Sequence, residues 1–456
     1  MGGELGDRDD WVEESFTTSH AHDEPVGEHM CAAAYERKMR IYRWYSRLNS
    51  QCAARTNQVM PNSSVTAHPV VCWIEGGEAR SARWRSESGA TPPKRVLIAH
   101  DHIRADDAYG LACQGTALLW RGDFQNARQM LLALASRADR QPRKPQRKSG
   151  VSSMPTLPAE AFHLHRQARS QRARTLGALL VLLDEDYSIA LPRAPNIRQA
   201  CAEAYGPGRG PSVTPLRALL GLIGAHEWRT KGIAIAAIGG RIHPHYGVFA
   251  PIRREYVDLV ATAPLVASRS LSSLAFDIGT GTGVLAAVLA RRGFRRVLAT
   301  DWDSRALACA RENLERLGLS EQVEVVHADL FPEGRAALVV CNPPWVPARP
   351  SSPIERGIYD PESRMLREFL DELPAHLEPG GEGWLILSDL AERLGLRTRS
   401  ELLSLFHAAG LRVMDRSDVR PIHPRAADDT DPLHAARASE VTSLWRLAVR
   451  CVQASS

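Results

Sequence analysis

The side chains in this chain that could do chemistry are concentrated in a glycine-rich segment and a proline-stiffened segment. The glycine-rich segment reads Asp277-Ile-Gly-Thr-Gly-Thr-Gly283. Glycine permits unusual backbone dihedral angles and leaves no Cβ to obstruct a ligand. The spacing is G-x-G-x-G, because Val284 stands where the dinucleotide fingerprint G-x-G-x-x-G has its last glycine. We therefore expect a nucleoside-type ligand other than a nicotinamide dinucleotide, bound by Asp277, Gly279, Thr280, Gly281 and Gly283.

Two carboxylates follow at the ends of later candidate strands. Asp301 ends the strand 297–301, where a carboxylate can accept both ribose hydroxyls of a nucleoside. The alternative is that Asp301 caps the helix that begins near Ser304, although Asp303 suits that role better. Asp329 follows the strand 323–327 and is placed to accept from an adenine amino group, with Leu330 or Phe331 lining the ring.

The proline-stiffened segment reads Asn342-Pro-Pro-Trp345. Prolines fix φ, so Pro343 and Pro344 should hold the Asn342 side chain and a proline carbonyl toward one point. An amide or aromatic amine is a poor nucleophile because its lone pair is delocalised, and two acceptors on its N–H groups help to localise that pair. Trp345 can stack on the planar group. We expect all four residues to be catalytic; the alternative is a rigid turn with a core Trp.

Alternating strands and helices must position these segments. The apolar pattern predicts helices between the first five of seven strands, at 274–278, 297–301, 323–327, 336–341, 383–388, 411–416 and 441–449. Such alternation is typical of an α/β fold with a doubly wound parallel sheet. The last two strands are joined by a polar loop, 420–440, without a helical pattern, which predicts a terminal antiparallel strand pair.

From about residue 240 onward the chain resembles the class I S-adenosylmethionine-dependent methyltransferases. Within them it is similar to the small-domain group that carries an N-P-P-aromatic motif, which includes protein-glutamine methyltransferases acting on release factors and ribosomal RNA base N-methyltransferases. The segments Gly247–Pro251 and Val346-Pro347 also resemble the glutamine enzymes. The resemblance implies S-adenosyl-L-methionine as the cofactor and methyl transfer to a planar amide or amino nitrogen.

The chain departs from the glutamine enzymes at two places. They usually have Tyr where this chain has Trp345, and their Pro-Arg-Pro-Glu-Thr-Glu run is replaced by Pro251-Ile-Arg-Arg-Glu-Tyr256. The acceptor therefore stays open between a protein glutamine loop and structured RNA. RNA is favoured over DNA, since no module for DNA sequence recognition is evident.

Three segments are predicted along the 456 residues. Residues 1–95 have neither a helical nor a strand period and are expected to be disordered, or an extension outside the natural protein. Residues 96–235 are expected to form a mainly helical accessory or substrate domain with a basic linker at 137–150. Residues 236–452 are expected to form the methyltransferase domain. The linker is interpreted either as a solvated segment or as a phosphate-binding strip.

Composition narrows the setting. The net charge of +5 permits an anionic partner without requiring one, and the eight cysteines are scattered without a C-x-x-C pair. His20, His22, His29 and Cys31 are metal-type residues, but we interpret them as a solvated tail and predict no metal site. No apolar run approaches the ~20 residues of a membrane span, so a cytoplasmic location without a membrane partner is expected. The sequence does not predict an oligomeric state.

Two other classes of function remain as alternatives. A nicotinamide-dependent oxidoreductase could use a similar sheet, but Val284 and Asn342 both count against it. A non-catalytic RNA-binding protein could retain a methyltransferase fold, but the complete Asn342–Trp345 segment counts against such decay.

Overall fold

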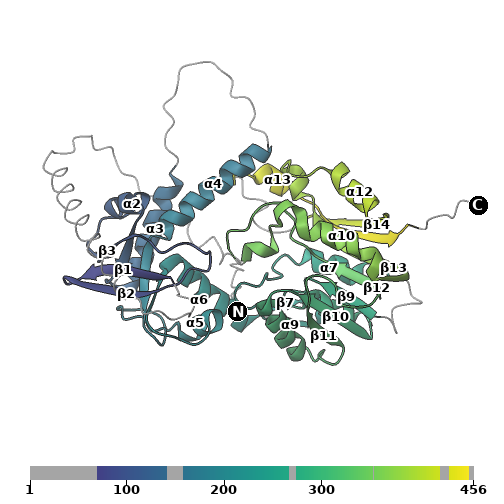
Figure 1. Cartoon of the computed structure of the whole chain (residues 1–456), viewed down its shortest axis with the longest axis horizontal. Coiled ribbons are helices and arrows are strands. Elements are labelled where there is room, and N and C mark those ends of the chain that lie inside the picture. The colour runs from purple at the N-terminus through teal and green to yellow at the C-terminus, as the bar shows by residue number, and fades with distance from the viewer. Residues whose placement is uncertain (1–68, 141–157, 266–273, 353, 422–430, 451–456) are drawn as a thin grey trace, which may run out of the picture. The chain divides into compact units, whose positions relative to one another are not determined.

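The computed structural model describes residues 69–140, 158–265, 274–352, 354–421 and 431–450 (Figure 1). The described chain divides into two compact units. The N-terminal unit contains residues 69–86, 90–140 and 170–224, and the C-terminal unit contains the remaining described residues. Each unit is described by itself below. No described helix is long and apolar enough to cross a bilayer.

The C-terminal unit is built on a seven-stranded sheet with the order β11-β10-β9-β12-β13-β15-β14. Its strands are β9 (Leu274–Ile278), β10 (Arg296–Asp301), β11 (Val323–His327), β12 (Ala336–Cys341), β13 (Leu377–Ser388), β14 (Leu411–Val419) and β15 (Thr442–Val449). The pairs among β9 to β13 are parallel, and β15 is antiparallel to both β13 and β14. The predicted α/β sheet with a terminal antiparallel pair is confirmed.

Helices cover both faces of this sheet. One face packs against α7 (Glu255–Thr262), α8 (Val284–Arg291) and α9 (Ser304–Arg316). The other packs against α10 (Arg364–His376) and α12 (Arg399–Ala408). Side chains alternate between the two cores along each strand, as Ala275 and Phe276 do on β9. Strand β12, at the centre of the sheet, is therefore buried on both sides, which explains its continuous apolar run.

Shorter elements complete the C-terminal unit. A two-stranded antiparallel sheet pairs β7 (Ile233–Ile235) with β8 (Gly240–Ile242). Helix α13 (His434–Ala438) lies inside the loop predicted to have no helix. Further short helices are η1 (Ala236–Ile238), η2 (Ile354–Gly357), η3 (Pro361–Ser363) and α11 (Leu390–Arg393).

The N-terminal unit corrects the prediction of a mainly helical domain. It contains a six-stranded sheet with the order β1-β2-β6-β5-β4-β3. The strands are β1 (Val70–Glu75), β2 (Glu78–Trp84), β3 (Arg95–Ala99), β4 (Thr116–Trp120), β5 (Leu179–Leu183) and β6 (Ser212–Pro215). The helices are α2 (Ala105–Cys113), α3 (Phe124–Asp139), α5 (Arg198–Tyr205) and parts of α4 (Pro158–Leu176) and α6 (Leu216–Lys231).

The error has a physical cause. Leu118-Leu119-Trp120 and Leu179–Leu183 are short continuous apolar runs, and periodicity cannot separate a buried strand from a buried helix over such a length. Four of the five residues of β5, and all five of β4, are buried. Residues 104–137, within the domain predicted to be mainly helical, therefore form a helix, a buried strand and a second helix.

The prediction for residues 1–95 is also wrong for its described part. Residues 70–84 form an antiparallel hairpin whose two-residue turn, Gly76-Gly77, has positive φ at both positions. Val71, Trp73, Ala82 and Trp84 bury one face of the hairpin in a common core. The alternation that produces this face spans too few residues to stand out in the sequence. Residues 1–68, including the His20–Cys31 cluster, lie outside the described residues.

Candidate functional site

The sheet brings the two predicted motifs together. Strands β9 and β12 are neighbours, with Ile278 paired to Cys341. The glycine loop starts directly after Ile278, and Asn342 directly follows Cys341. In parallel sheets the carboxyl ends of neighbouring strands form the usual ligand crevice. Segments far apart in sequence thus meet at one sheet edge.

The glycine loop adopts a backbone that requires its glycines. Gly279, Gly281 and Gly283 have φ of +71°, +54° and +81°. A Cβ on Gly281 would meet no heavy atom within 4 Å, whereas a Cβ on Gly283 would lie 3.2 Å from Ala310 Cα. A Cβ on Gly279 would lie 2.9 Å from Met365 Cε. Gly283 thus lets helix α9 approach the loop, while Gly281 borders open space that a ligand can use.

Asp277 is a buried carboxylate at the end of β9, with only 1% of its surface exposed. Its Oδ2 accepts from Thr280 Oγ1 at 2.6 Å and from the Ala286 N–H at 2.9 Å, but its Oδ1 has no partner. Burial raises the pKa of Asp277 to about 6. An unpartnered buried carboxylate oxygen fits a ligand that carries positive charge.

Asp301 ties its own strand end to the glycine loop. Its carboxylate accepts from the Gly281 N–H at 3.0 Å and from the Asp303 N–H at 2.9 Å. Asp303, as predicted, caps helix α9 by accepting from the Arg305 N–H. Burial raises the pKa of Asp301, which the two backbone donors partly offset. Asp301 therefore fixes the loop while keeping lone pairs for hydroxyl donors.

The third strand end is arranged differently. Leu330 is buried with φ of +82°, and its carbonyl accepts from Thr300 Oγ1 at 2.6 Å. The side chain of Asp329 is 74% exposed and pairs with Arg364 at 3.5 Å. Asp329 therefore lies at the surface of the C-terminal unit and pairs with helix α10.

The Asn342–Trp345 segment contains a hydrogen bond that the sequence did not predict. Trp345 Nε1 donates to Asn342 Oδ1 at 2.9 Å. The guanidinium of Arg253 lies 5.0 Å from the centre of the Trp345 ring. Pro343 is buried and Pro344 is half-buried between them. The oxygen expected to grip a substrate N–H thus already accepts one hydrogen bond.

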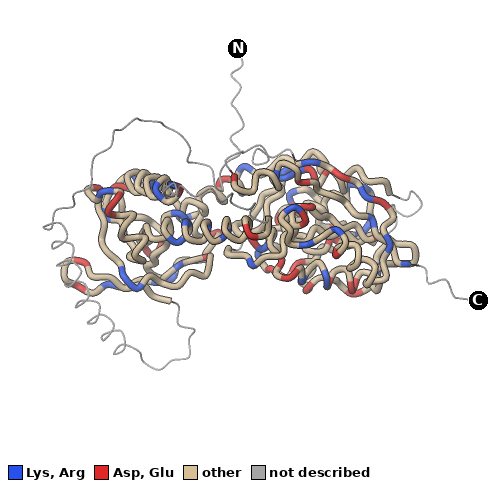
Figure 2. The backbone as a smooth tube through the Cα atoms, turned by 90° about the horizontal axis from the view of Figure 1, so that it is seen from above, with Lys and Arg blue, Asp and Glu red and all other residues tan. Residues whose placement is uncertain are grey.

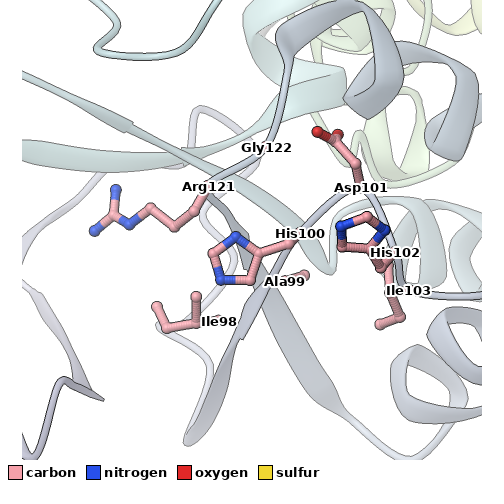
Figure 3. Close-up of a pocket in the computed structure, with 8 residues that line it drawn as sticks. All are labelled: Ile98, Ala99, His100, Asp101, His102, Ile103, Arg121 and Gly122. Atoms are coloured by element: carbon pink, nitrogen blue, oxygen red, sulfur yellow. The ribbon is translucent and has the colours of Figure 1, made fainter.

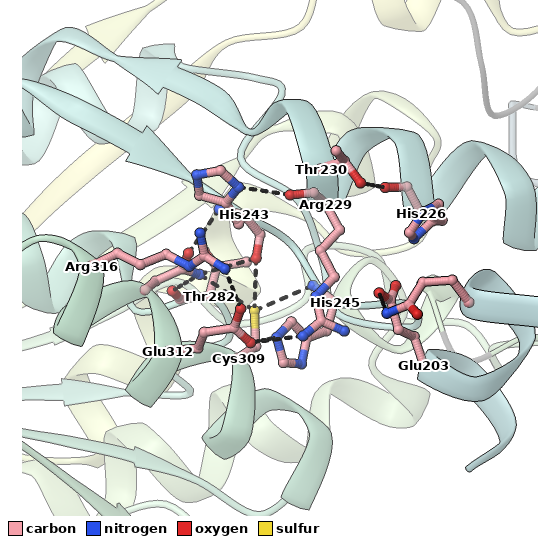
Figure 4. Close-up of polar contacts among 12 residues, drawn as sticks. Glu203, His226, Arg229, Thr230, His243, His245, Thr282, Cys309, Glu312 and Arg316 are labelled. Atoms are coloured by element: carbon pink, nitrogen blue, oxygen red, sulfur yellow. Dashed lines mark hydrogen bonds and ion pairs between the residues drawn. The ribbon is translucent and has the colours of Figure 1, made fainter. Parts of the chain in front are cut away.

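A polar network holds the glycine loop from the side of helix α9 (Figure 4). Asn313 Nδ2 donates to Thr282 O at 3.0 Å and to His243 O at 3.3 Å, and Asn313 Oδ1 accepts from the His243 N–H at 2.8 Å. Cys309 is buried beside this pair, which raises its pKa to about 12. The role of His243 as a partner of a buried Asn comes from a contact that no local pattern reveals.

Glu312, the residue before Asn313 on α9, extends this network. It binds Arg229 at 2.8 Å, His245 Nε2 at 2.6 Å and Arg316 at 2.7 Å. Burial opposes ionisation of Glu312, but hydrogen bonds from Arg316 and His245 and the charge of Arg229 outweigh it and lower its pKa to about 2. Arg229 and His245, which precede the glycine loop in the chain, are thereby held against α9.

Asp360 has a larger role than a surface loop residue. It is 4% exposed, and its carboxylate accepts from the N–H groups of Met365 and Leu366 at 3.1 and 3.2 Å. Burial raises its pKa. Its backbone N–H donates to Val346 O at 2.9 Å. Asp360 thus joins helix α10 to the residues that follow Trp345.

Where the structure describes them, arginines of the predicted basic linker and of helix α4, which follows it, form several ion pairs. Residues 141–157 lie outside the described residues. Among the others, Arg137 pairs with Asp106 at 2.7 Å, Arg172 with Asp139 at 2.7 Å and Arg169 with Glu355 at 3.9 Å. Figure 2 shows Lys and Arg interspersed with Asp and Glu along the described chain. These pairs favour a charged helix face over a phosphate-binding strip.

The N-terminal unit has a depression of about 620 Å³ at the carboxyl ends of β3 and β4 (Figure 3). Its lining includes Asp101, His102 and Arg121. Arg121 is bound by Glu75 at 2.7 Å, and Asp101 accepts from the Asp123 N–H at 3.1 Å. Arg121 is thus already paired with a carboxylate, and Asp101 already accepts a backbone hydrogen bond. No three His, Cys, Asp or Glu side chains among the described residues are placed to hold a metal ion.

Comparison with known proteins identifies similar sequences for the C-terminal half. Residues 240–395 match the family model for the methyltransferase small domain. The chain is 37% identical over 146 residues to a ribosomal protein L11 methyltransferase from Pelotomaculum thermopropionicum, covering 31% of this chain and 39% of that protein. It is 33% identical over 150 residues to a release factor glutamine methyltransferase from Cereibacter sphaeroides, covering 30% and 51%.

A third relative acts on RNA by its name. The chain is 34% identical over 112 residues to a ribosomal RNA small subunit methyltransferase C from Alcanivorax borkumensis, covering 24% of this chain and 30% of that protein. The chain thus spans about half or less of the length of each of these relatives. The matches confirm the resemblance predicted from the two motifs: over residues 240–395, this chain is similar to the methyltransferase small domain.

Proposed function

We propose that the C-terminal unit transfers a methyl group from S-adenosyl-L-methionine to the nitrogen of a planar amide or amino group. The observation that carries this proposal is the pairing of Ile278 with Cys341, which places the glycine loop and Asn342 at one sheet edge. One motif suits a nucleoside cofactor, and the other suits a flat nitrogen acceptor.

The residues of the crevice suit this cofactor in three respects. Gly281 faces open space, so the backbone can approach a ligand closely. Asp277 Oδ1 is buried without a partner, which suits the positive charge of the methionine part. Asp301 retains lone pairs for ribose hydroxyls. Gly279, Thr280, Gly283 and Leu330 would complete the cradle, and Asp329 would close over the adenine only if its exposed side chain turned inward.

When bound, S-adenosyl-L-methionine supplies an electrophilic methyl group on a sulfonium centre. The role of the protein is then to present a nitrogen lone pair in line with it. Asn342 Oδ1 has a second lone pair that can accept an acceptor N–H, and the rigid Pro343-Pro344 turn offers a backbone carbonyl for the other N–H. Catalysis would rest on proximity and electrostatics, without a covalent enzyme intermediate.

We further propose a macromolecular acceptor, either a glutamine in a protein loop or a base in structured RNA. The names of the relatives, which include protein and ribosomal RNA methyltransferases, support this range. A base within a duplex would have to leave the stack to reach Asn342. The paired arginines of the described helix face lend no particular weight to RNA.

Two measurements test the proposal. Titration calorimetry on the full chain should detect binding of S-adenosyl-L-methionine and its demethylated product, and no binding of NADH; exclusive NADH binding would instead support the oxidoreductase alternative. Tritiated methyl transfer into fractionated cell lysate, followed by RNase, DNase or protease, should then identify the acceptor by which enzyme releases the label. Retention of full transfer by Asn342→Ala would refute the assignment of Asn342.

A further inference from the structure

We infer that Trp345 and Arg253 are positioning residues that fix the orientation of the Asn342 side-chain amide. This inference deepens the proposed function and rests on it, since it concerns how the same site presents Asn342 to an acceptor nitrogen.

The hydrogen bond between Trp345 and Asn342 has only one possible polarity. An indole N–H donates and cannot accept, whereas the Asn amide has an accepting end and a donating end. With Trp345 Nε1 at 2.9 Å from the amide, the accepting oxygen must face the indole. Rotation of the amide by 180° would set two N–H groups against each other. Trp345 therefore selects one of the two amide orientations.

We refer to this fixed orientation of the Asn342 amide as the lock. It requires that the indole itself be held in place, and Arg253 holds it. The Arg253 guanidinium lies 5.0 Å from the centre of the Trp345 ring, within the range of a cation–π contact. Arg253 is anchored in turn by Glu255 at 2.7 Å, by Glu440 at 3.0 Å and by Thr442 Oγ1 at 3.4 Å. The side chain of Glu440 is only 5% exposed.

The ring is therefore covered by a fixed cation on one face and bonded to Asn342 through its edge. Because Oδ1 keeps one lone pair and Nδ2 keeps its N–H groups, the locked amide presents a constant donor–acceptor pattern to the acceptor. Tyrosine at position 345 could not enforce this pattern, because a hydroxyl can both donate and accept. Trp345 and the segment that contains Arg253 both depart from the glutamine enzymes, and together they fix the orientation of the Asn342 amide.

The inference is tested by a double-mutant cycle on the full chain. The variants are Arg253→Met, Trp345→Phe and their combination, with Arg254→Met as the matched control because Arg254 is an exposed neighbour. Methyl transfer from tritiated S-adenosyl-L-methionine to the labelled lysate fraction is measured beside affinity for the demethylated product. We expect Trp345→Phe to lower the transfer rate about tenfold, as loss of one oriented hydrogen bond predicts. Cofactor affinity should stay within about twofold in all variants.

Non-additivity is the decisive result. Introduced into the wild type, Arg253→Met should lower the methyl-transfer rate several-fold. Introduced into Trp345→Phe, it should lower this rate no further, and Arg254→Met should leave the rate unchanged in both backgrounds. Independent, multiplicative effects of the two substitutions would overturn the inference.

An indole ¹⁵N NMR spectrum keeps the test independent of activity. The Nε1–H signal of Trp345 is the one of the ten Trp signals that Trp345→Phe removes. Asn342→Ala and Arg253→Met should both shift this signal, and Arg254→Met should not. An unmoved signal in Asn342→Ala refutes the lock even in a folded protein. If the wild type methylates no fraction, the proposed function fails while this spectrum still decides whether the lock exists.

Discussion

The side-chain nitrogen of Asn313 donates to the carbonyl oxygen of Thr282 at 3.0 Å, so helix α9 holds the glycine loop through one buried amide. Asn313 is fully buried and serves three other contacts, with the His243 N–H, the His243 carbonyl and Cys309 Sγ. The loop conformation thus depends on a residue outside the loop.

Asn313→Ala should be strongly destabilising. It leaves the Thr282 and His243 groups buried without partners, at a cost of about 2–4 kcal/mol in the free energy of unfolding. Urea denaturation measures this cost, and amide hydrogen exchange of 280–283 should accelerate. Glu315→Ala, an exposed site on the same helix, is the control and should change the free energy by less than ~0.5 kcal/mol. Equal effects of the two variants would contradict the assigned role.

Two glycines of the loop should respond differently to alanine. Gly283→Ala puts a Cβ 3.2 Å from Ala310 at positive φ, so the free energy of unfolding should fall by more than ~2 kcal/mol. Gly281→Ala meets open space and should lose only the ~1 kcal/mol of a positive-φ alanine, but its Cβ would occupy ligand space. Calorimetry with S-adenosyl-L-methionine measures the affinity of each variant. Relative to its loss in the free energy of unfolding, Gly281→Ala should lose more affinity than Gly283→Ala. The reverse order would refute the proposed cradle.

The buried carboxylate of Asp277 predicts an unusual pH dependence. Its folded pKa of about 6 lies above the ordinary value of 3.8, so the folded state binds the proton more tightly. The ionised Asp277 carboxylate therefore lowers the free energy of unfolding. This effect is absent below about pH 4, grows between pH 4 and 6, and reaches ~3 kcal/mol above pH 6. Relative to the wild type, Asp277→Asn should therefore gain stability as pH rises from 4.5 to 7. Urea titrations at several pH values measure this; parallel curves for the two proteins would contradict it.

Glu312 should show the opposite dependence. Its folded pKa of about 2 lies below the ordinary 4.5, so its stabilisation is complete above about pH 4.5 and is lost as pH falls toward 2. After allowance for its 28% exposed side chain, Glu312→Gln should cost about 2 kcal/mol at pH 7, with the gap closing below pH 4.5. Glu315→Gln on the exposed side of α9 is the control. A cost that persists unchanged at pH 3 would exclude the ionic origin.

The strands of the C-terminal unit could be predicted because a central parallel strand is apolar on both faces and is bounded by turn residues. Strand β12, whose six residues are all buried and which is followed directly by Asn342, is such a case. From that order of elements the meeting of the glycine loop and Asn342 follows, since parallel strands end at one edge. The N-terminal sheet could not be predicted because its buried runs, such as Leu118-Leu119-Trp120, are too short to show a period.

Contacts between residues that lie far apart in the chain also could not be predicted from the sequence. Nothing in the local pattern around Asn313 or His243 indicates their hydrogen bonds across 70 positions. The Asn342–Trp345 bond is local, but Arg253, which lies over the Trp345 ring, is paired with Glu440, 187 positions further along the chain. Stacking of Trp345 on an acceptor remains a prediction.

Strand β15 lies between β13 and β14, although it follows both in the chain. During synthesis, β14 therefore has no strand to pair with, and β13 has an open edge, until residues 442–449 leave the ribosome. Glu440 and Thr442, which anchor Arg253, emerge only then. Nascent chains interrupted before this strand would expose two unpaired β edges, a template for aggregation. The proposed acceptor site can therefore mature only after strand β15 has been synthesised, later than every other strand of the described sheet.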